Sequence, residues 1–332
     1  MLNAPPSAPP AVGKLAVLKR YVNEHGEELE EVTCPLCGQT DATLALEAND
    51  LLYDRPGNYR LVRCNGCSLS YVNPRPTPAA LGAHYPEDYH CYRTVESYPR
   101  LVQPFVAHEV QEQATRRIKS IERVLGPIRP ETEILDVGCG QNALLKLIRD
   151  TRRAVGLGIE MKPEMVAHIR EELHMPVVEG TLLDADLESG RFDLAMMMEY
   201  LEHEPDPLRV LSEVRRVLKP GGHVIIEIPD PEGAPARLFG RHWVNLDLPR
   251  HLVFFDRKTL ARALAETGFE VVSHERYSIP LYVGYSVALK FGASKIMQRW
   301  SLISALGYSL GVPFLPALRW LPEFSFVVAR AI

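Results

Sequence analysis

The sequence lacks two features that would assign it to a membrane or to the secretory route. None of its apolar runs extends over about 18 uninterrupted residues, so no transmembrane helix is predicted. Its first residues, MLNAPPSAPPAVGK, have no positively charged start followed by an apolar core and are rich in proline instead. We therefore expect a flexible N-terminal tail over residues 1–32 and a protein that works in the cytoplasm.

Positive charge is also in short supply. Lysine and arginine number 37 against 42 aspartates and glutamates, which gives a net charge of −5. A nucleic-acid-binding surface over the whole molecule is therefore not expected. An apolar fraction of 46% with 24% charged residues is ordinary for a globular protein, and 332 residues suit one large and one small module.

Cysteines are few, but four of the six follow a pattern. Cys34 and Cys37 form one C-x-x-C pair and Cys64 and Cys67 form another, with 26 residues between the pairs. Two such turns supply four thiolates for a tetrahedral zinc ion, and four protein ligands make the ion structural because no coordination position stays open. Two disulfides or unbound thiols are the alternative. The spacing predicts a zinc-ribbon module over residues 33–76.

Residues Glu133 to Leu145, EILDVGCGQNALL, have the pattern of a ligand-binding turn between a buried strand and a helix. Gly138 and Gly140 let the backbone turn tightly and approach a ligand without a side chain in the way. Asp136 places a carboxylate at the end of the strand, and Glu160 ends the next apolar run, about twenty residues after the glycines. A doubly wound sheet uses an acid there to bind ribose hydroxyls. The pattern predicts a nucleoside-containing cofactor.

The turn alone leaves the cofactor open, because Gly138, Gly140 and Ala143 also fit the G-x-G-x-x-A fingerprint of dinucleotide binding. Asp136 argues against NAD, since its charge would face a pyrophosphate, and suits a ligand that carries an ammonium group. Later segments add landmarks that a dehydrogenase does not need: FDLAM at 192–196, LEH at 201–203, DP at 206–207 and LKPGG at 218–222.

In this order and spacing the motifs resemble those of the Rossmann-like S-adenosylmethionine-dependent methyltransferases, over roughly residues 128–269 and the final strand. Alternation of strand and helix predicts a doubly wound α/β fold with a mostly parallel sheet. The resemblance implies a seven-stranded sheet whose last strand is antiparallel. Strands are expected near 133–138, 155–159, 176–179, 192–198, 222–228, 270–277 and 324–330, and helices near 142–151, 162–173, 207–218 and 257–267.

This methyltransferase domain would occupy residues 128–332, preceded by a helical linker or cap over residues 77–127. The linker contains an amphipathic helix from Val102 to Leu125, whose apolar periodicity is imperfect around Gln111 to Arg117. We expect this helix to cover one face of the sheet.

The resemblance implies S-adenosylmethionine (SAM) as the cofactor. The acid that usually follows a glycine after the third strand is replaced by Thr181, so Asp184 is expected near the adenine, or Leu182 or Leu183 against its ring. The expected cofactor-binding residues are Asp136, Gly138, Cys139, Gly140, Asn142, Glu160, Met161, Leu182, Asp184 and Glu199. Cys139 is expected to act there as a small packing residue and not as a nucleophile.

Methyl transfer to a hydroxyl requires a general base. His251 is the first candidate, because it lies in a polar and aromatic substrate loop over residues 229–257, at the sheet edge where loops carry ligand contacts. His203, at the end of the fourth strand, is the second candidate, although it could instead orient the adjoining loop. His242 is the reserve.

The predicted function is methyl transfer to a small-molecule acceptor at a hydroxyl, with carbon and nitrogen as alternative acceptor atoms. An RNA methyltransferase that grips nucleic acid through the zinc ribbon is a second reading, which the few arginines of that module support poorly. A cofactor-binding protein without turnover is a third.

The ribbon, the NPRP break at 73–76 and the following tyrosines resemble a bacterial group of methyltransferases in which a zinc ribbon precedes the catalytic domain. Many of its members modify small natural products or sugars. The resemblance implies that Tyr85 and Tyr89 cap the cofactor or the substrate. The apolar segment 280–322 is expected to be a helical insertion that forms a lid, a homodimer surface or an interfacial membrane contact.

Overall fold

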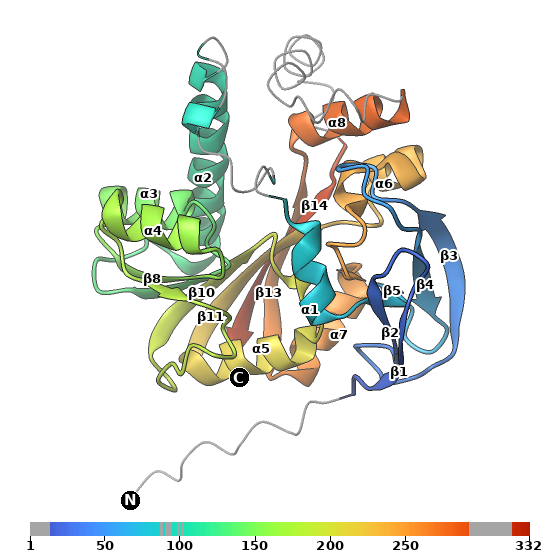
Figure 1. The fold of residues 1–332 in the computed structure, drawn as a ribbon. Coiled ribbons are helices and arrows are strands. Elements are labelled where there is room, and N and C mark those ends of the chain that lie inside the picture. Colours follow the sequence, from blue (N-terminus) through green and yellow to red (C-terminus); the bar gives the residue numbers. More distant parts are fainter. Residues whose placement is uncertain (1–13, 87–88, 90–94, 98–99, 101–102, 292–320) are drawn as a thin grey trace, which may run out of the picture.

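A computed structural model describes residues 14–86, 89, 95–97, 100, 103–291 and 321–332. Its central element is a seven-stranded sheet (Figure 1). The β7 to β11 strands run parallel, and β14 pairs antiparallel with both β11 and β13. The predicted fold class and the antiparallel last strand are therefore confirmed. In spatial order the strands are β13 (Phe269–Tyr277), β14 (Phe324–Ala331), β11 (Leu218–Pro229), β10 (Phe192–Met198), β7 (Glu133–Val137), β8 (Val155–Glu160) and β9 (Val177–Glu179).

Helices cover both faces of this sheet, and Figure 1 shows α3 and α4 on one side and α5 and α7 on the other. Local signals explain where two of them begin. The Asp206 side chain caps α5 at its start, and Asp256 forms a capping box with Thr259 at the start of α7. The helices lie where the sequence predicts them: α2 (Gln103–Leu125), α3 (Ala143–Arg152), α4 (Pro163–Glu171), α5 (Pro207–Val217) and α7 (Arg257–Glu266).

The sheet separates two hydrophobic cores. Ile134 of β7 packs in the core that α2, α3 and α4 cover, whereas its neighbour Leu135 packs in the core that α5 and α7 cover. Successive side chains of a strand point to opposite faces, so a strand buried on both sides needs an uninterrupted apolar run. This requirement explains why β7 and β10 carry apolar residues at neighbouring positions.

A smaller all-β module precedes the large sheet. It contains a sheet of β1 (Val17–Val22), β2 (Glu28–Val32) and β6 (Arg75–Pro76), and a second sheet of β3 (Ala42–Ala48), β4 (Tyr59–Cys64), β5 (Ser70–Val72) and β12 (Val253–Phe254). The two C-x-x-C turns lie in this module, and their cysteines share one core cluster with residues of α5 and α7. The module and the large domain are therefore packed against each other.

One predicted boundary is wrong. The expected flexible tail over residues 1–32 includes β1 and β2, which pair with each other and, through β2, with β6. Residues 1–13 lie outside the described residues. The substrate loop 229–257 also contributes a strand to the ribbon module, because β12 pairs with β5, with Val253 opposite Tyr71.

The linker and the insertion are partly described. The linker contains α1 (Pro78–Leu81), η1 (Gly82–His84), η3 (Val95–Ser97) and α2, and the substrate loop contains α6 (Ala234–Phe239), η5 (Gly240–His242) and η6 (Val244–Leu246). The predicted helical insertion begins with α8 (Pro280–Lys290), while residues 292–320 lie outside the described part. None of the described helices has the length and apolar character needed to cross a membrane.

Candidate functional site

The glycine turn after β7 has the backbone geometry that its sequence predicts. Gly138 and Gly140 adopt φ angles of +69° and +51°, which side chains other than glycine rarely tolerate. The amide groups of Gly138 and Cys139 donate to the Ile159 carbonyl of β8 at 2.9 and 3.0 Å. These bonds hold the turn against the neighbouring strand at the carboxyl edge of the sheet, where open parallel sheets bind ligands.

Glu160 closes the turn from the other side. Its Oε2 accepts a hydrogen bond from the Gly140 amide at 2.8 Å, and its Oε1 accepts one from the Lys162 amide at 2.9 Å. The carboxylate is buried, yet each oxygen keeps a lone pair beyond these bonds. It is therefore fixed in place and can still accept from a ligand hydroxyl.

Asp136 lies at the end of β7 with only 4% of its surface exposed. Burial raises the pKa of Asp136 to about 7, Arg117 opposes the rise, and the nearby Glu160 adds to it. Two acids in one crevice are costly to ionise without a cation. A ligand with a positive charge would stabilise both, which is the property that the sequence predicts for this site.

Tyr200 lies over the turn and was not predicted. A Cβ atom at Gly138 would come within 2.2 Å of its Cδ2. The ring therefore occupies the space that the missing side chain leaves, and a larger residue at 138 is excluded. The Tyr200 residue also leads directly into η4 (Leu201–His203), so this turn connects the crevice to the histidines described below.

The other predicted cofactor residues are in varied positions. Cys139 packs against β8, since a Cβ at Gly158 would come within 2.6 Å of its Sγ. Asn142 is buried with φ +57° just before α3, and Leu182 is fully buried in the core. Met161 is 64% exposed, and the exposed Asp184 accepts from the Thr181 hydroxyl at 2.5 Å. Burial leaves Leu182 little surface with which to contact a ligand.

Glu199 directly follows β10, has a φ angle of +53° and belongs to a charge cluster. Its Oε1 accepts from Arg117 of α2 at 3.0 Å, and its Oε2 accepts from the Tyr282 hydroxyl of α8 at 3.2 Å. Arg117 also pairs with the fully buried Glu227 of β11. Burial raises the pKa of Glu199, although Arg117 opposes this rise. The cluster fixes α2 and α8 at the rim of the crevice.

His203 and His251 lie together, with ring centroids 4.6 Å apart in an edge-to-face arrangement. The Nδ1 atom of His251 is 2.7 Å from the Asn245 carbonyl, and Nδ1 of His203 is 3.0 Å from the Arg250 carbonyl. A carbonyl only accepts, so each Nδ1 carries a proton and each neutral ring has its lone pair on Nε2. Burial lowers the pKa of both rings, that of His203 to about 3, so both are neutral at pH 7.

Tyr85 and Tyr89 border this pair. The Tyr85 hydroxyl is 3.0 Å from Nδ1 of His203, and the Tyr89 hydroxyl donates to Asp247 at 3.1 Å. Both tyrosines therefore lie beside the substrate loop. The third candidate, His242, is in η5, which contacts α6, α8 and β3.

Arg250, next to His251, is completely buried between two acids. Its guanidinium pairs with Asp50 of the ribbon module at 2.7 Å and with Asp247 at 2.5 Å. These bonds tie the substrate loop to the ribbon, and the single guanidinium is the positive partner of both carboxylates.

The four ribbon cysteines converge. Their Sγ atoms all lie within 4.8 Å of one another, with 3.4 Å between Cys34 and Cys67 and between Cys37 and Cys64. All four are free thiols, so the disulfide alternative is wrong. A tetrahedral zinc with Zn–S bonds of about 2.3 Å places its sulfurs about 3.8 Å apart, and the cluster needs little movement to hold one.

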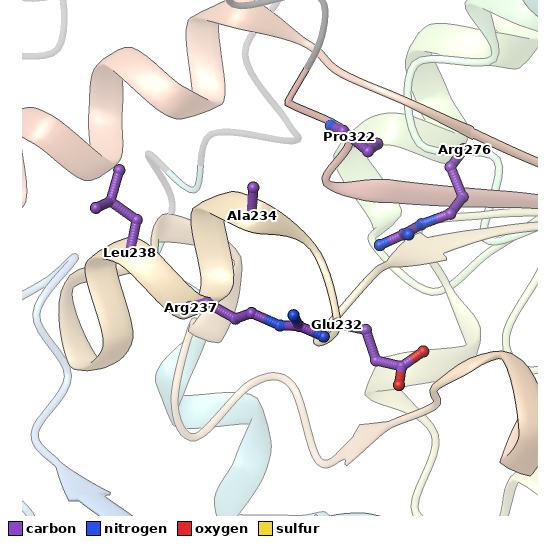
Figure 2. Close-up of a pocket in the computed structure, with 6 residues that line it drawn as sticks. All are labelled: Glu232, Ala234, Arg237, Leu238, Arg276 and Pro322. Carbon is purple, nitrogen blue, oxygen red and sulfur yellow. The ribbon is translucent and has the colours of Figure 1, made fainter.

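An open hollow of about 480 Å³ lies elsewhere, between α6 and the end of β13 (Figure 2). Its charged lining has both signs, and Arg276 already pairs with Asp230. The lining residues are Glu232, Ala234, Arg237, Leu238, Arg276 and Pro322, and they include none of the predicted site residues.

Three residues that shape the site were missed: Tyr200, Arg117 and Glu227. A signal existed for two of them. Arg117 lies where the apolar periodicity of its helix fails, and Glu227 is an acid within the apolar strand sequence HVIIEIP. Tyr200 shows no comparable pattern.

Comparison with known families matches residues 106–274 to a family described as "Methyltransferase domain". The chain is 33% identical over 228 residues to an uncharacterized 37.1 kDa protein in transposon TN4556 of Streptomyces fradiae. The aligned region covers 64% of this chain and 63% of that protein. It is 36% identical over 97 residues to the ubiquinone biosynthesis O-methyltransferase of Pectobacterium atrosepticum, covering 28% of this chain and 40% of the relative. The chain thus spans less than two thirds of either relative. Among solved structures, geranyl diphosphate methyltransferase in complex with SAM overlaps with a TM-score of 0.47 at 17% identity, over 66% of this chain and 85% of that one.

Proposed function

Because the chain belongs to the methyltransferase-domain family, which matches half of its length, we propose that it transfers a methyl group from SAM to a hydroxyl of a small molecule. The glycine turn between two buried carboxylates is the observation that carries this proposal. It offers a cradle for a nucleoside and negative charge for a cation. The hydroxyl as acceptor is supported by the names of the ubiquinone biosynthesis O-methyltransferases to which the chain is similar.

The residues of the crevice fit SAM. Asp136 would bind the ammonium group, which offsets the cost of its burial, and Glu160 would accept from the ribose hydroxyls while it holds the Gly140 amide. Tyr200 would close the crevice over Gly138 and exclude water.

When bound, SAM would supply an electrophilic methyl group to an attacking hydroxyl oxygen, with its sulfur as the leaving group. The proton of the acceptor hydroxyl must then leave, and a neutral imidazole nitrogen can take it. His251 is the better base, because the pKa of His203, at about 3, makes that ring a weak proton acceptor. The edge-to-face contact between the rings and the Asn245 carbonyl keep the Nε2 lone pair of His251 in a fixed orientation.

Calorimetry with SAM and with NAD tests the cofactor. We expect one SAM to bind per chain, no binding of NAD, and an affinity for SAM at least tenfold lower in Asp136→Asn, because the amide cannot neutralise the ammonium group. Asp150→Asn is the matched control, since Asp150 lies on α3 and pairs on the surface with Lys146. Binding of NAD alone, or of neither compound, would overturn the proposal.

Turnover is tested by the release of S-adenosylhomocysteine in the presence of a panel of small hydroxyl compounds. His251→Ala should lower the rate by about 10² or more while SAM binding persists. Unchanged turnover would remove His251 as the base. Transfer to an RNA but to none of the small molecules would replace the proposed acceptor class.

We propose in addition that Cys34, Cys37, Cys64 and Cys67 hold a structural Zn²⁺. The two turns share one backbone pattern: the amide of the first cysteine donates to the carbonyl five residues on, in Cys34 to Gln39 and in Cys64 to Leu69. Zinc bound by four thiolates would fix these turns and supply no catalytic water. Cys64→Ser should lose this ion and Cys139→Ser should keep it, as measured by elemental analysis. Equal zinc contents would contradict the assignment.

Two further expectations are proposals of the same kind. Free thiols suit the reducing cytoplasm, where we expect the protein to work.

A homodimer through segment 280–322 is supported by two exposed apolar residues, Val287 on α8 and Phe291 directly after it. Sedimentation of the wild type and of a Phe291→Ser variant tests it, and a monomeric wild type would refute it.

A further inference from the structure

Glu202 is a buried carboxylate for which the mechanism has no use. It lies in η4 with 2% of its surface exposed, and neither of its carboxylate oxygens has a hydrogen-bond partner from another residue in the described part of the chain. An ionised carboxylate in such a place is strongly destabilising unless a proton or a cation neutralises it. Arg250, which adjoins His251 along the chain, is already paired with Asp50 and Asp247.

Two imidazoles complete a set of ligands around Glu202. A carboxylate oxygen of Glu202 and one ring nitrogen each of His203 and His251 lie within 4.8 Å of one another. The main chain brings them together, because the Leu252 amide donates to the Glu202 carbonyl at 2.7 Å and so places the segment with His251 beside η4.

Both imidazoles are oriented as metal ligands are. Each has its Nδ1 bound to a backbone carbonyl, that of Asn245 or that of Arg250, which leaves Nε2 unprotonated. Proteins commonly fix the tautomer and the direction of metal-binding histidines in this way. Tyr85 adds a second contact to Nδ1 of His203 and further restrains that ring.

We propose that Glu202, His203 and His251 bind one divalent transition-metal ion, separate from the ion of the four cysteines. Two imidazoles and a carboxylate favour Zn²⁺, Co²⁺ or Fe²⁺ over Mg²⁺ and Ca²⁺, which prefer oxygen ligands. The metal would neutralise the unpartnered Glu202 and use both Nε2 lone pairs.

The ion would also have a role in the reaction. Three protein ligands leave a coordination position open, and a hydroxyl oxygen bound there loses its proton more readily. In the metal-bound form the ion would orient and acidify the acceptor hydroxyl, whose proton would pass to solvent water. His251 would then be a metal ligand, and its role as the base would apply to the metal-free form. This role rests on the proposed methyl transfer, whereas the metal site itself does not.

Metal content and a cobalt titration of the full-length protein test the site without any measurement of activity. The wild type should bind two equivalents of Co²⁺ per chain: one with the intense near-ultraviolet band of thiolate ligation and one with weaker visible bands alone. Glu202→Gln and His251→Asn should each bind only the thiolate-ligated equivalent, which also shows that the ribbon is folded. His242→Asn, a histidine variant outside the cluster, should still bind two.

A wild type that binds only a thiolate-ligated equivalent would overturn the proposal, as would two equivalents in both cluster variants. These outcomes leave the proposed function testable on its own. If the second equivalent is absent but His251→Asn still abolishes methyl transfer, the histidine acts as a base and the enzyme assignment stands. If the second equivalent is present but SAM does not bind, the metal site stands and the enzyme assignment fails.

Discussion

Two buried polar clusters meet at the neighbouring residues Arg250 and His251, and they differ in whether their carboxylates have a cationic partner. Arg250 pairs with Asp50 and Asp247, and all three are buried and satisfied. Glu202 faces two neutral imidazoles and has no positive partner among the described residues. The first cluster is complete in the protein alone and holds two modules together. The second lacks a cation, which is the property of a binding site.

Removing Arg250 from its cluster with Asp50 and Asp247 should have the largest effect on stability. Arg250→Met removes the guanidinium that pairs with both Asp50 and Asp247, so two buried carboxylates lose this counter-charge. We expect the free energy of unfolding to fall by about 3–5 kcal/mol, as for other buried ion pairs that lose one partner. Denaturant unfolding at pH 7 measures it. A loss as small as that of a surface pair would mean that the cluster is not a structural tie.

Asp136, in the cofactor crevice, is another buried carboxylate that a cationic ligand would stabilise, and the pH dependence of SAM binding tests this. Its pKa of about 7 means that the carboxylate is increasingly protonated below pH 7, and a protonated acid does not attract an ammonium group. The affinity for SAM should therefore fall by up to about tenfold for each pH unit below 7, and should level off above pH 8. Calorimetry between pH 5.5 and 8.5 measures this. An affinity independent of pH would show that Asp136 does not bind the cationic group.

Glu202→Gln gives a smaller effect, whose sign depends on pH. Burial raises the pKa of Glu202 in the folded protein above its unfolded value. Its contribution to stability is therefore fully present below the unfolded pKa and is lost as the pH rises through the folded pKa. In protein that carries only the ribbon metal, Glu202→Gln should be more stable than the wild type at pH 8.5 and show no such gain at pH 4. Thermal unfolding at the two pH values tests this, and a destabilised variant at pH 8.5 would reveal an unseen partner.

The smallest effect is expected at the surface. Arg262→Met removes the same type of charge as Arg250→Met, but its partner Glu266 lies four residues away on the exposed side of α7. Such helix pairs contribute about 0.3–0.5 kcal/mol, so unfolding should change by no more than that. The same denaturant experiment provides the comparison. A loss of several kcal/mol here would show that burial is not what separates the two arginines.

The sequence predicts the fold and the backbone geometry of the glycine turn well because both depend on neighbours along the chain. Gly138, Gly140 and Glu160 lie on adjacent elements, and alternating strands and helices leave few possible topologies. The acceptor side is different, since Tyr85, Glu202 and His251 come from three distant segments. No local pattern reports their proximity, although each histidine could be named as a candidate by its residue type.

Residues 17–32 and Arg117 show the same limit of local sequence patterns. Residues 17–32 have the polar composition of a solvated segment, and their strands exist only because β2 pairs with β6, more than forty residues further along the chain. Arg117 interrupts an apolar stripe for a reason that becomes visible only when β10 and β11 bring Glu199 and Glu227 to it. Long-range pairing, and not local preference, decides both.

The pairing of β12 with β5 makes the ribbon a template for the segment that carries His251. The Val72 amide donates to the Leu252 carbonyl at 2.9 Å, immediately after this histidine. Removing the first 76 residues would thus strip the segment that carries His251 of its strand partner β5, and the truncated protein should lose order around His251 while its glycine turn persists. The ribbon module is therefore part of the structural support of this histidine.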